Sequence, residues 1–235
     1  MFWNQGKMKA VTFSYDDGVT QDIRLITLMN KYGLKGTFNL NSQRMAENRL
    51  LRWNGAPICQ YTLHRGDIKG LYEGHEVAAH TLTHAILPEC DDAEVIRQVE
   101  QDRLDLSELV GYEVVGMAYP GNGRSVTNDD RVAEIIKNHT GIRYSRTTSL
   151  TGDFELQDNL FRFKPTAQTR QFDKLMELGK AFVEMETDKP QIFYIWGHAY
   201  EMDYTSDSWV RLEEFFRLIS NRDDIFYGTN KEVLL

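Results

Sequence analysis

The feature that most constrains this chain is an alternation of short apolar, β-branched runs with longer stretches of helical periodicity. The runs predict strands at residues 10–15, 37–40, 76–79, 114–119, 142–145 and 191–196. Between them, apolar residues recur every three or four positions, which predicts helices within residues 25–32, 95–109, 132–139, 172–183 and 209–219. Strands that alternate with helices predict βαβ units and a mainly parallel sheet or barrel.

Neither a repeat nor a low-complexity tract nor a linker divides the 235 residues. At roughly 150 residues per domain the length allows one or two domains, and a single large α/β or barrel domain also fits. The one long interval between predicted strands, residues 41–74, holds Gly55, Pro57 and Gly66 and a helical turn near residues 67–72. We interpret it as an insertion and expect one domain over residues 1–235.

Charge and cysteine content exclude several classes of protein. With 27 basic against 35 acidic side chains the net charge is −8, which argues against a nucleic-acid partner. Cys59 and Cys90 do not make a disulfide framework. No apolar run approaches the ~18 residues of a membrane span, and the first residues do not resemble a secretion signal. We expect a soluble protein. Its compartment (cytoplasmic, or extracytoplasmic after removal of a leader) and its oligomeric state are open.

Two adjacent carboxylates, Asp16 and Asp17, end the first predicted strand and are followed by Gly18. A turn at a strand end can aim both side chains into one cleft, although Asp-Asp-Gly is also an ordinary start of a solvated loop.

His80 and His84 follow the third predicted strand. Two histidines four residues apart lie on one face of a helical turn and can bind one metal ion together. Thr81 stands where a zincin has its glutamate base, so a metalloprotease of that type is disfavoured. Four of the six histidines fall between residues 64 and 84, which strengthens the case for metal binding and leaves two packing or capping imidazoles as an equal alternative.

The two later strand ends also carry polar groups. The turn Gly121-Asn122-Gly123 can expose backbone N–H groups, as an oxyanion hole requires, or it can be a plain loop. His198 follows the last predicted strand, and its ordinary pKa suits general acid catalysis, although a single histidine in such a place is more often structural. All these features lie at carboxyl ends of predicted parallel strands, where barrel and open α/β enzymes place their sites. Together they indicate metal-assisted hydrolysis.

The sequence resembles the polysaccharide deacetylases of the NodB homology type, carbohydrate esterase family four. Residues 12–18 are similar to the first motif of that family, and residues 76–84 closely match its histidine-pair motif. The third and fifth motifs would fall at residues 119–121 and 196–198. The resemblance runs from residue 10 to about residue 200.

The resemblance implies a distorted, incomplete (β/α) barrel of seven strands. It implies a divalent metal, commonly zinc, held by Asp17, His80 and His84. Asp16 would take a proton from the attacking water, and His198 would protonate the leaving group. The Gly121 N–H would face the oxyanion, and Trp196 would line the acyl pocket. We also expect Tyr119 and Glu201 to contact the substrate, an acetylated oligo- or polysaccharide or a related small molecule.

The sequence departs from the family pattern at two places. Ala118 stands where the family has an arginine that steadies the catalytic base, and Gly121 replaces an aromatic residue. The candidates for the missing guanidinium are Arg124, Arg143, Arg146 and Arg162. A clear fourth motif is also missing, and Asp153, Asp158 and Glu201 are the candidates for its carboxylate.

Three functions are compatible with these residues. The first is a metal-dependent deacetylase of an N- or O-acetylated carbohydrate. The second is an amidohydrolase of the same fold that acts on a small amide other than a sugar. The third is a catalytically impaired carbohydrate-binding homologue. Tyr200, Tyr204 and Trp209 could form a sugar-stacking rim, but the helical spacing of Trp209 with Leu212 and Phe216 favours the core for Trp209.

Overall fold

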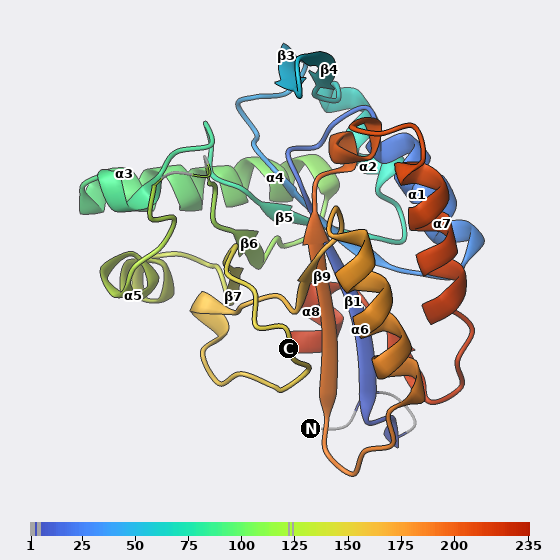
Figure 1. Ribbon diagram of the computed structural model, residues 1–235. Helices are drawn as coiled ribbons and strands as arrows, with labels where there is room; N and C mark the ends of the chain where they lie inside the picture. The colour runs from blue at the N-terminus through green and yellow to red at the C-terminus, as the bar shows by residue number, and fades with distance from the viewer. Residues whose placement is uncertain (1–2, 4–5, 122, 124) are drawn as a thin grey trace.

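The computed structural model describes residues 3, 6–121, 123 and 125–235 (Figure 1). Its strands are β1 (Lys9–Asp16), β2 (Gly36–Leu40), β3 (Asn48–Trp53), β4 (Ala56–Tyr61), β5 (Glu76–Ala79), β6 (Gly116–Ala118), β7 (Tyr144–Arg146), β8 (Ala167–Gln168), β9 (Gln191–Gly197) and β10 (Ile225–Tyr227). Its helices are α1 (Asp22–Lys31), α2 (Ile68–Leu71), α3 (Asp92–Ile96), α4 (Asp102–Val110), α5 (Asp130–His139), α6 (Phe172–Glu184), α7 (Ser208–Ile219) and α8 (Asn230–Leu234). Every strand and helix predicted from the sequence is present, although β6 and β7 are shorter than predicted.

The parallel strands form one curled sheet in the order β7-β6-β5-β2-β1-β9-β8. β9 pairs with one edge of β1, so β10 and β2 share the other edge: β10 pairs with residues 9–11 and β2 with residues 13–16. Eight strands therefore fill seven positions around the sheet. Phe163 bridges to β7 through backbone bonds to Ser145 and Thr147 of 3.0 and 2.8 Å. The fold is the predicted distorted, incomplete (β/α) barrel.

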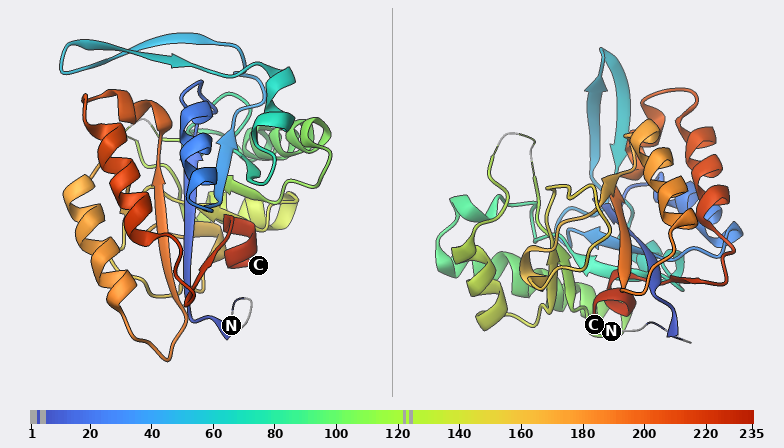
Figure 2. Two further views of the ribbon diagram at one scale, coloured as in Figure 1. Left: turned by 90° about the vertical axis from the view of Figure 1, so that its right-hand side faces the viewer. Right: turned by 60° about the horizontal axis from the view of Figure 1, so that its bottom comes forward.

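The two central strands, β1 and β9, are enclosed within the molecule. All residues of β1 and β9 are buried, which is typical of parallel strands enclosed by helices. Phe13 packs edge-to-face on Phe216 of α7, and Phe193 packs on Phe215 of the same helix. The helices α6 and α7 lie side by side over this part of the sheet (Figure 2). This packing holds the carboxyl ends of β1 and β9 in place.

The interval at residues 41–74 contains an antiparallel hairpin, β3–β4, that the hydrophobic pattern does not predict. Asn54 and Gly55 form its two-residue turn, and both have positive φ angles (48° and 83°). Asn-Gly is the preferred sequence for such a turn because both residues tolerate the left-handed region. The hairpin projects beyond the carboxyl ends of the barrel strands (Figure 2).

Several elements were missed for a common reason. β8, β10 and α8 contain two, three and five residues, which is too short for a hydrophobic period. The helix predicted at residues 209–219 is present as α7, but it is not the last helix, because α8 follows it.

Cys59 and Cys90 are both free. Across the residues that the structure describes, no helix has the length and apolar character to cross a bilayer.

Candidate active site

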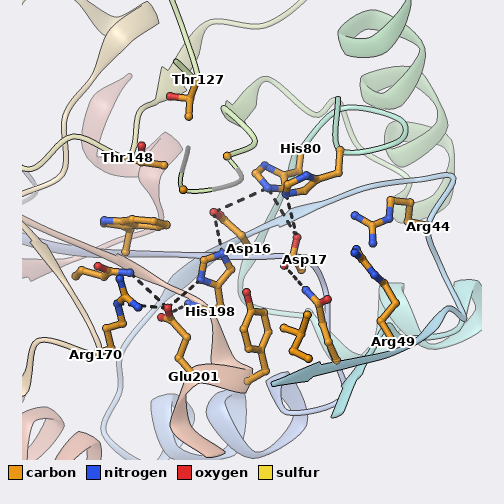
Figure 3. Close-up of a pocket in the computed structure, with 18 of the residues that line it drawn as sticks. Asp16, Asp17, Arg44, Arg49, His80, Thr127, Thr148, Arg170, His198 and Glu201 are labelled. Carbon is orange, nitrogen blue, oxygen red and sulfur yellow. Dashed lines mark hydrogen bonds and ion pairs between the residues drawn. The ribbon is translucent and has the colours of Figure 1, made fainter. Parts of the chain in front are cut away.

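A cavity of about 790 Å³ opens at the carboxyl ends of the barrel strands (Figure 3). The predicted site residues that line it are Asp16, Asp17, His80, His84, Gly121, Trp196, His198 and Glu201. Tyr119 does not line it. The strand ends thus bring together side chains that are up to 185 residues apart in the sequence (Asp16 to Glu201).

Asp17, His80 and His84 form a possible metal-binding group, with their ligand atoms all within 4.8 Å of one another. The Oδ1 atom of Asp17 lies 3.9 Å from Nε2 of His80 and 3.7 Å from Nε2 of His84. This Oδ1 atom is buried and has no hydrogen-bond partner among the described residues. The Nδ1 atom of His80 is 2.8 Å from the Ala118 carbonyl, and a proton on Nδ1 leaves the Nε2 lone pair free for an ion. These donors fit a divalent cation.

The two histidines converge through an irregular loop, and the predicted helical turn is wrong. Thr81 and His84 have φ angles of 65° and 62°, which a right-handed helical turn excludes. Asp17 is also left-handed, at 80°. Left-handed backbone at non-glycine residues costs about 1–3 kcal/mol each and collects at functional sites.

The helix that follows the loop holds it in this shape. A π-helical turn at Arg97–Gln101 joins α3 to α4, and the Gln98 carbonyl in it accepts a hydrogen bond of 3.0 Å from Leu82 N. Asp102 accepts hydrogen bonds from the backbone N–H groups of His80 (3.0 Å) and Ser42 (2.7 Å). One helix therefore positions both the histidine loop and the segment after β2.

Asp16 ends β1 and is held by Arg146, which ends β7. The Nη2 atom of Arg146 lies 2.6 Å from both carboxylate oxygens, and Asn39 donates a further hydrogen bond of 2.8 Å. The Arg146 side chain is fully buried, and its Cζ atom lies 4.6 Å from the centre of the Trp196 ring. Of the four candidate arginines, Arg146 supplies the guanidinium beside this aspartate.

The other three arginines do not reach Asp16 or lie outside the description. Arg143 is exposed. Arg162 pairs with Asp130 and donates to Asn128. Arg124, like Asn122 of the predicted turn, lies outside the described residues.

The surroundings of Asp16 favour its ionised form. Burial alone would raise its pKa, but the Arg146 guanidinium, with His80 and His198, outweighs that cost and holds the pKa below its usual range. Asp16 is therefore a carboxylate at neutral pH.

His198 lies between two carboxylates. Its Nε2 atom is 4.0 Å from Oδ2 of Asp16, and its Nδ1 atom is 3.5 Å from Oε1 of Glu201. Burial opposes its protonation, but Glu201, followed by Asp17 and Asp16, raises the pKa of His198 to about 9. Of the three candidates for the fourth-motif carboxylate, Glu201 lies at this histidine, whereas Asp153 and Asp158 are exposed.

A family model described as polysaccharide deacetylase matches residues 4–144, more than half of the chain. The chain belongs to the polysaccharide deacetylase family. The matched range includes both aspartates and both loop histidines and ends before Arg146, Trp196 and His198. No curated protein matches the chain.

Solved structures share the fold at low sequence identity. PuuE allantoinase matches with a TM-score of 0.69 and 12% identity, covering 98% of this chain and 90% of its own. A structure from Mycobacterium smegmatis assigned as a polysaccharide deacetylase matches with a TM-score of 0.66 and 14% identity, covering 99% and 91%. The deacetylase PplD of Streptococcus pyogenes, in complex with acetate, matches with a TM-score of 0.51 and 17% identity over 64% of this chain. The match spans 61% of the length of PplD.

The remaining predicted residues of this polysaccharide deacetylase family member take different places. The Gly121 N–H faces no backbone acceptor in the part of the chain that is described. Trp196 is buried, and its Nε1 atom has no partner among those residues. The side chain of Tyr119 is fully buried, and its hydroxyl donates to the Phe161 carbonyl (2.8 Å), so its expected substrate contact is wrong. Tyr119 directly follows the end of β6, and its side chain packs in the core instead of lining the cavity.

The aromatic residues of the C-terminal part divide as the helical spacing suggests. Tyr200 and Tyr204 line the cavity. Trp209 is buried, with the Arg24 guanidinium 4.4 Å from its ring centre, so Trp209 belongs to the core.

Sequence reasoning missed the cavity residues of the hairpin and of the segment before it. Gln60 of β4 donates a hydrogen bond of 2.7 Å to Oδ2 of Asp17. Arg44, Arg49 and Leu51 also line the cavity. Figure 3 shows Arg44 and Arg49 on one side of it and Arg170 near Glu201 on the other. The Asn54-Gly55 turn is the sequence signal that would have revealed the hairpin.

Proposed function

We propose that this protein is a metal-dependent hydrolase that removes acetyl groups from an N- or O-acetylated carbohydrate, with zinc as the metal. The observation that carries the proposal is the arrangement of the cavity. A three-residue donor set for a metal lies beside an arginine-held carboxylate and a histidine with a raised pKa. Membership of the polysaccharide deacetylase family supports an acetylated carbohydrate as the substrate.

Asp17, His80 and His84 would hold the metal, as an oxygen and two imidazole ligands typical of zinc. When bound, a divalent metal polarises an acyl oxygen and makes water acidic enough to attack near neutral pH. Asp16 is not one of these ligands and is ionised through Arg146. It can therefore accept the proton of the attacking water.

His198 would act as the acid on the other side of the cavity. Hydrolysis of an acetamide requires that the leaving nitrogen be protonated, and an imidazolium held by Glu201 can supply that proton. The Gly121 N–H would donate to the oxyanion. Trp196, whose indole N–H is unpaired within the described residues, would line the acyl pocket.

The test combines metal content with turnover. The zinc-loaded protein is expected to deacetylate acetylated sugars, and a chelator should abolish turnover reversibly. Asp17→Asn and His80→Gln should lose both zinc and activity. Asp16→Asn should keep zinc and lose activity by a factor on the order of 10²–10⁴. His139→Gln, an exposed histidine of α5, is the matched control and should change neither. Full turnover without a metal would overturn the proposal.

The substrate panel separates the remaining functions. Acetylated mono- and oligosaccharides are assayed beside small linear and cyclic amides. Turnover of the amides alone would assign the protein as an amidohydrolase of the same fold. Sugar binding without turnover by the zinc-loaded protein would assign it as a carbohydrate-binding homologue.

A further inference from the structure

The cavity carries more positive charge than a chain of net charge −8 leads one to expect. Three arginines, Arg44, Arg49 and Arg170, line it. Arg170 lies 3.6 Å from Glu201, and Arg44 lies 3.1 Å from Glu47. The side chain of Arg49 has neither a hydrogen bond nor an ion pair with any residue that the structure describes.

The hairpin places Arg49 next to the possible metal-binding group. Arg49 of β3 is the register partner of Gln60 of β4, and side chains that oppose each other in an antiparallel pair share one face, with Cβ atoms about 4.5–5.5 Å apart. Gln60 donates to Asp17. Arg49 is therefore one side chain away from a candidate metal ligand.

Arg44 reaches the same region from the segment between β2 and β3. Figure 3 shows Arg44 and Arg49 together on the side of Asp17 that faces away from His198, Glu201 and Arg170. Two guanidinium groups on one wall repel each other, and the carboxylates that line the cavity are engaged elsewhere. Asp16 is paired with Arg146, Glu201 lies near His198 and Arg170, and Asp17 accepts from Gln60.

We propose that Arg44 and Arg49 form a subsite for an anionic group of the substrate, a carboxylate or a phosphate monoester. A guanidinium group matches the geometry of both anions and can bind either through two parallel hydrogen bonds. The acyl group would then lie between the candidate metal ligands and His198, with the anion on the hairpin side. The inference rests on the proposed function for the identity of the acyl-bearing sugar, and it narrows the substrate to an acidic one.

The test is binding to the zinc-loaded protein by calorimetry, with three sugars that differ only at C6. They are N-acetylglucosamine, the uronic acid with a carboxylate at C6, and the 6-phosphate. At least one charged sugar should bind tenfold or more tightly than the neutral one, and comparison of the two charged sugars identifies the preferred anion. Arg49→Gln should remove this preference and leave the binding of N-acetylglucosamine unchanged.

The matched control is Arg52→Gln, on the same strand. Arg52 donates to the Gly55 carbonyl and does not line the cavity, so this variant should keep the preference. An anion that binds the metal alone would bind Arg49→Gln as tightly as the unaltered protein, and that result would overturn the subsite. Equal binding of all three sugars would also overturn it.

The experiment distinguishes a failure of the anion subsite from a failure of the proposed function. Binding of a charged sugar that depends on Arg49 but is not followed by deacetylation would support the anion subsite and contradict the proposed function. Deacetylation of neutral sugars that is unaffected by Arg49→Gln, without any preference for anions, would support the proposed function and contradict the anion subsite.

Discussion

At the scale of single residues, the site depends on how buried charges are paired. Asp16 is 2% exposed and Arg146 is fully buried. Isolated charges at such depth are costly, and each is acceptable here because the other lies beside it. The pairing also sets the protonation state of Asp16, which the proposed base requires.

Arg146→Gln should raise the pKa of Asp16, because burial then acts without the guanidinium that opposes it. A base must be ionised, so the acidic limb of the pH–rate profile should move to higher pH. Removal of one partner of a buried pair also costs about 3–5 kcal/mol of stability. Arg146→Lys keeps the positive charge and should recover part of both losses. The measurements are pH–rate profiles and urea unfolding, with the exposed Arg143→Gln as control. An unchanged acidic limb in Arg146→Gln would show that Arg146 does not set this pKa.

Glu201→Gln should lower the pKa of His198 from its value of about 9, because Glu201 is the main group that raises it. An acid must be protonated, so activity is present below this pKa and is lost as the pH rises through it. The alkaline limb should therefore move to lower pH, with a loss of roughly tenfold for each unit above the new pKa. Glu201→Asp keeps the negative charge, so its alkaline limb should move less than that of Glu201→Gln. A profile of kcat against pH checks this, and identical alkaline limbs would contradict it.

At the scale of elements, the hairpin β3–β4 is joined to the barrel by few but specific contacts. The Trp53 ring stacks on Tyr204 with centres 4.3 Å apart and planes at 7°. Gln21 donates to the Cys59 carbonyl (2.8 Å), and Gln60 donates to Asp17. The hairpin forms its own two-stranded sheet, and these side chains hold it over the cavity together with a backbone hydrogen bond of 2.8 Å from Thr20 to the Tyr61 carbonyl.

Trp53→Ala should loosen the hairpin without unfolding the barrel. An aromatic pair contributes about 0.5–1.5 kcal/mol beyond its buried area, so we expect KM to rise several-fold with a smaller change in kcat. Hydrogen exchange should become faster in β3 and β4 but not in β1 or β9. Leu50→Ala, on the exposed face of the same strand (58% exposed), is the control. Equal exchange in both variants would show that the stack does not hold the hairpin.

At the scale of the whole molecule, the barrel is completed by its last two elements. Asn230 of α8 is fully buried, donates to Thr12 (2.8 Å) and accepts from the hydroxyl of Tyr194 (2.7 Å). Its backbone N–H donates to Thr37. One side chain and its own N–H thus join β1, β2 and β9 beneath the cavity.

Asn230→Ala should lower the free energy of unfolding by about 2–4 kcal/mol, since it removes two buried hydrogen bonds, one from the Tyr194 hydroxyl and one to the Thr12 side chain. Urea unfolding measures this change, and Lys231→Ala, an exposed neighbour, should have little effect. Zinc content of the folded variant should be unchanged, because none of the candidate ligands contacts α8. A decrease in the free energy of unfolding below about 0.5 kcal/mol would show that the contacts of Asn230 in α8 do not stabilise the barrel.

Local patterns along the chain predict the longer strands and helices in their order, and the chemistry at the strand ends. Asp16, Asp17, His80, His84 and His198 each follow an apolar run, and the carboxyl ends of parallel strands meet at one edge. Spacing along the chain is enough for that inference, because it depends on local periodicity and on one topological rule.

The partners of these residues depend on contacts between segments that lie far apart along the chain. Arg146 is 130 residues from Asp16 and is one of four arginines that the sequence leaves equivalent. The pairing exists because the curled sheet brings the end of β7 across to the end of β1. The same holds for Arg49, which reaches the cavity through a hairpin of exposed strands. The strands β3 and β4 have a weak hydrophobic pattern, so the sequence does not predict them. Cross-strand pairing and the stack of Trp53 on Tyr204 set their position in space.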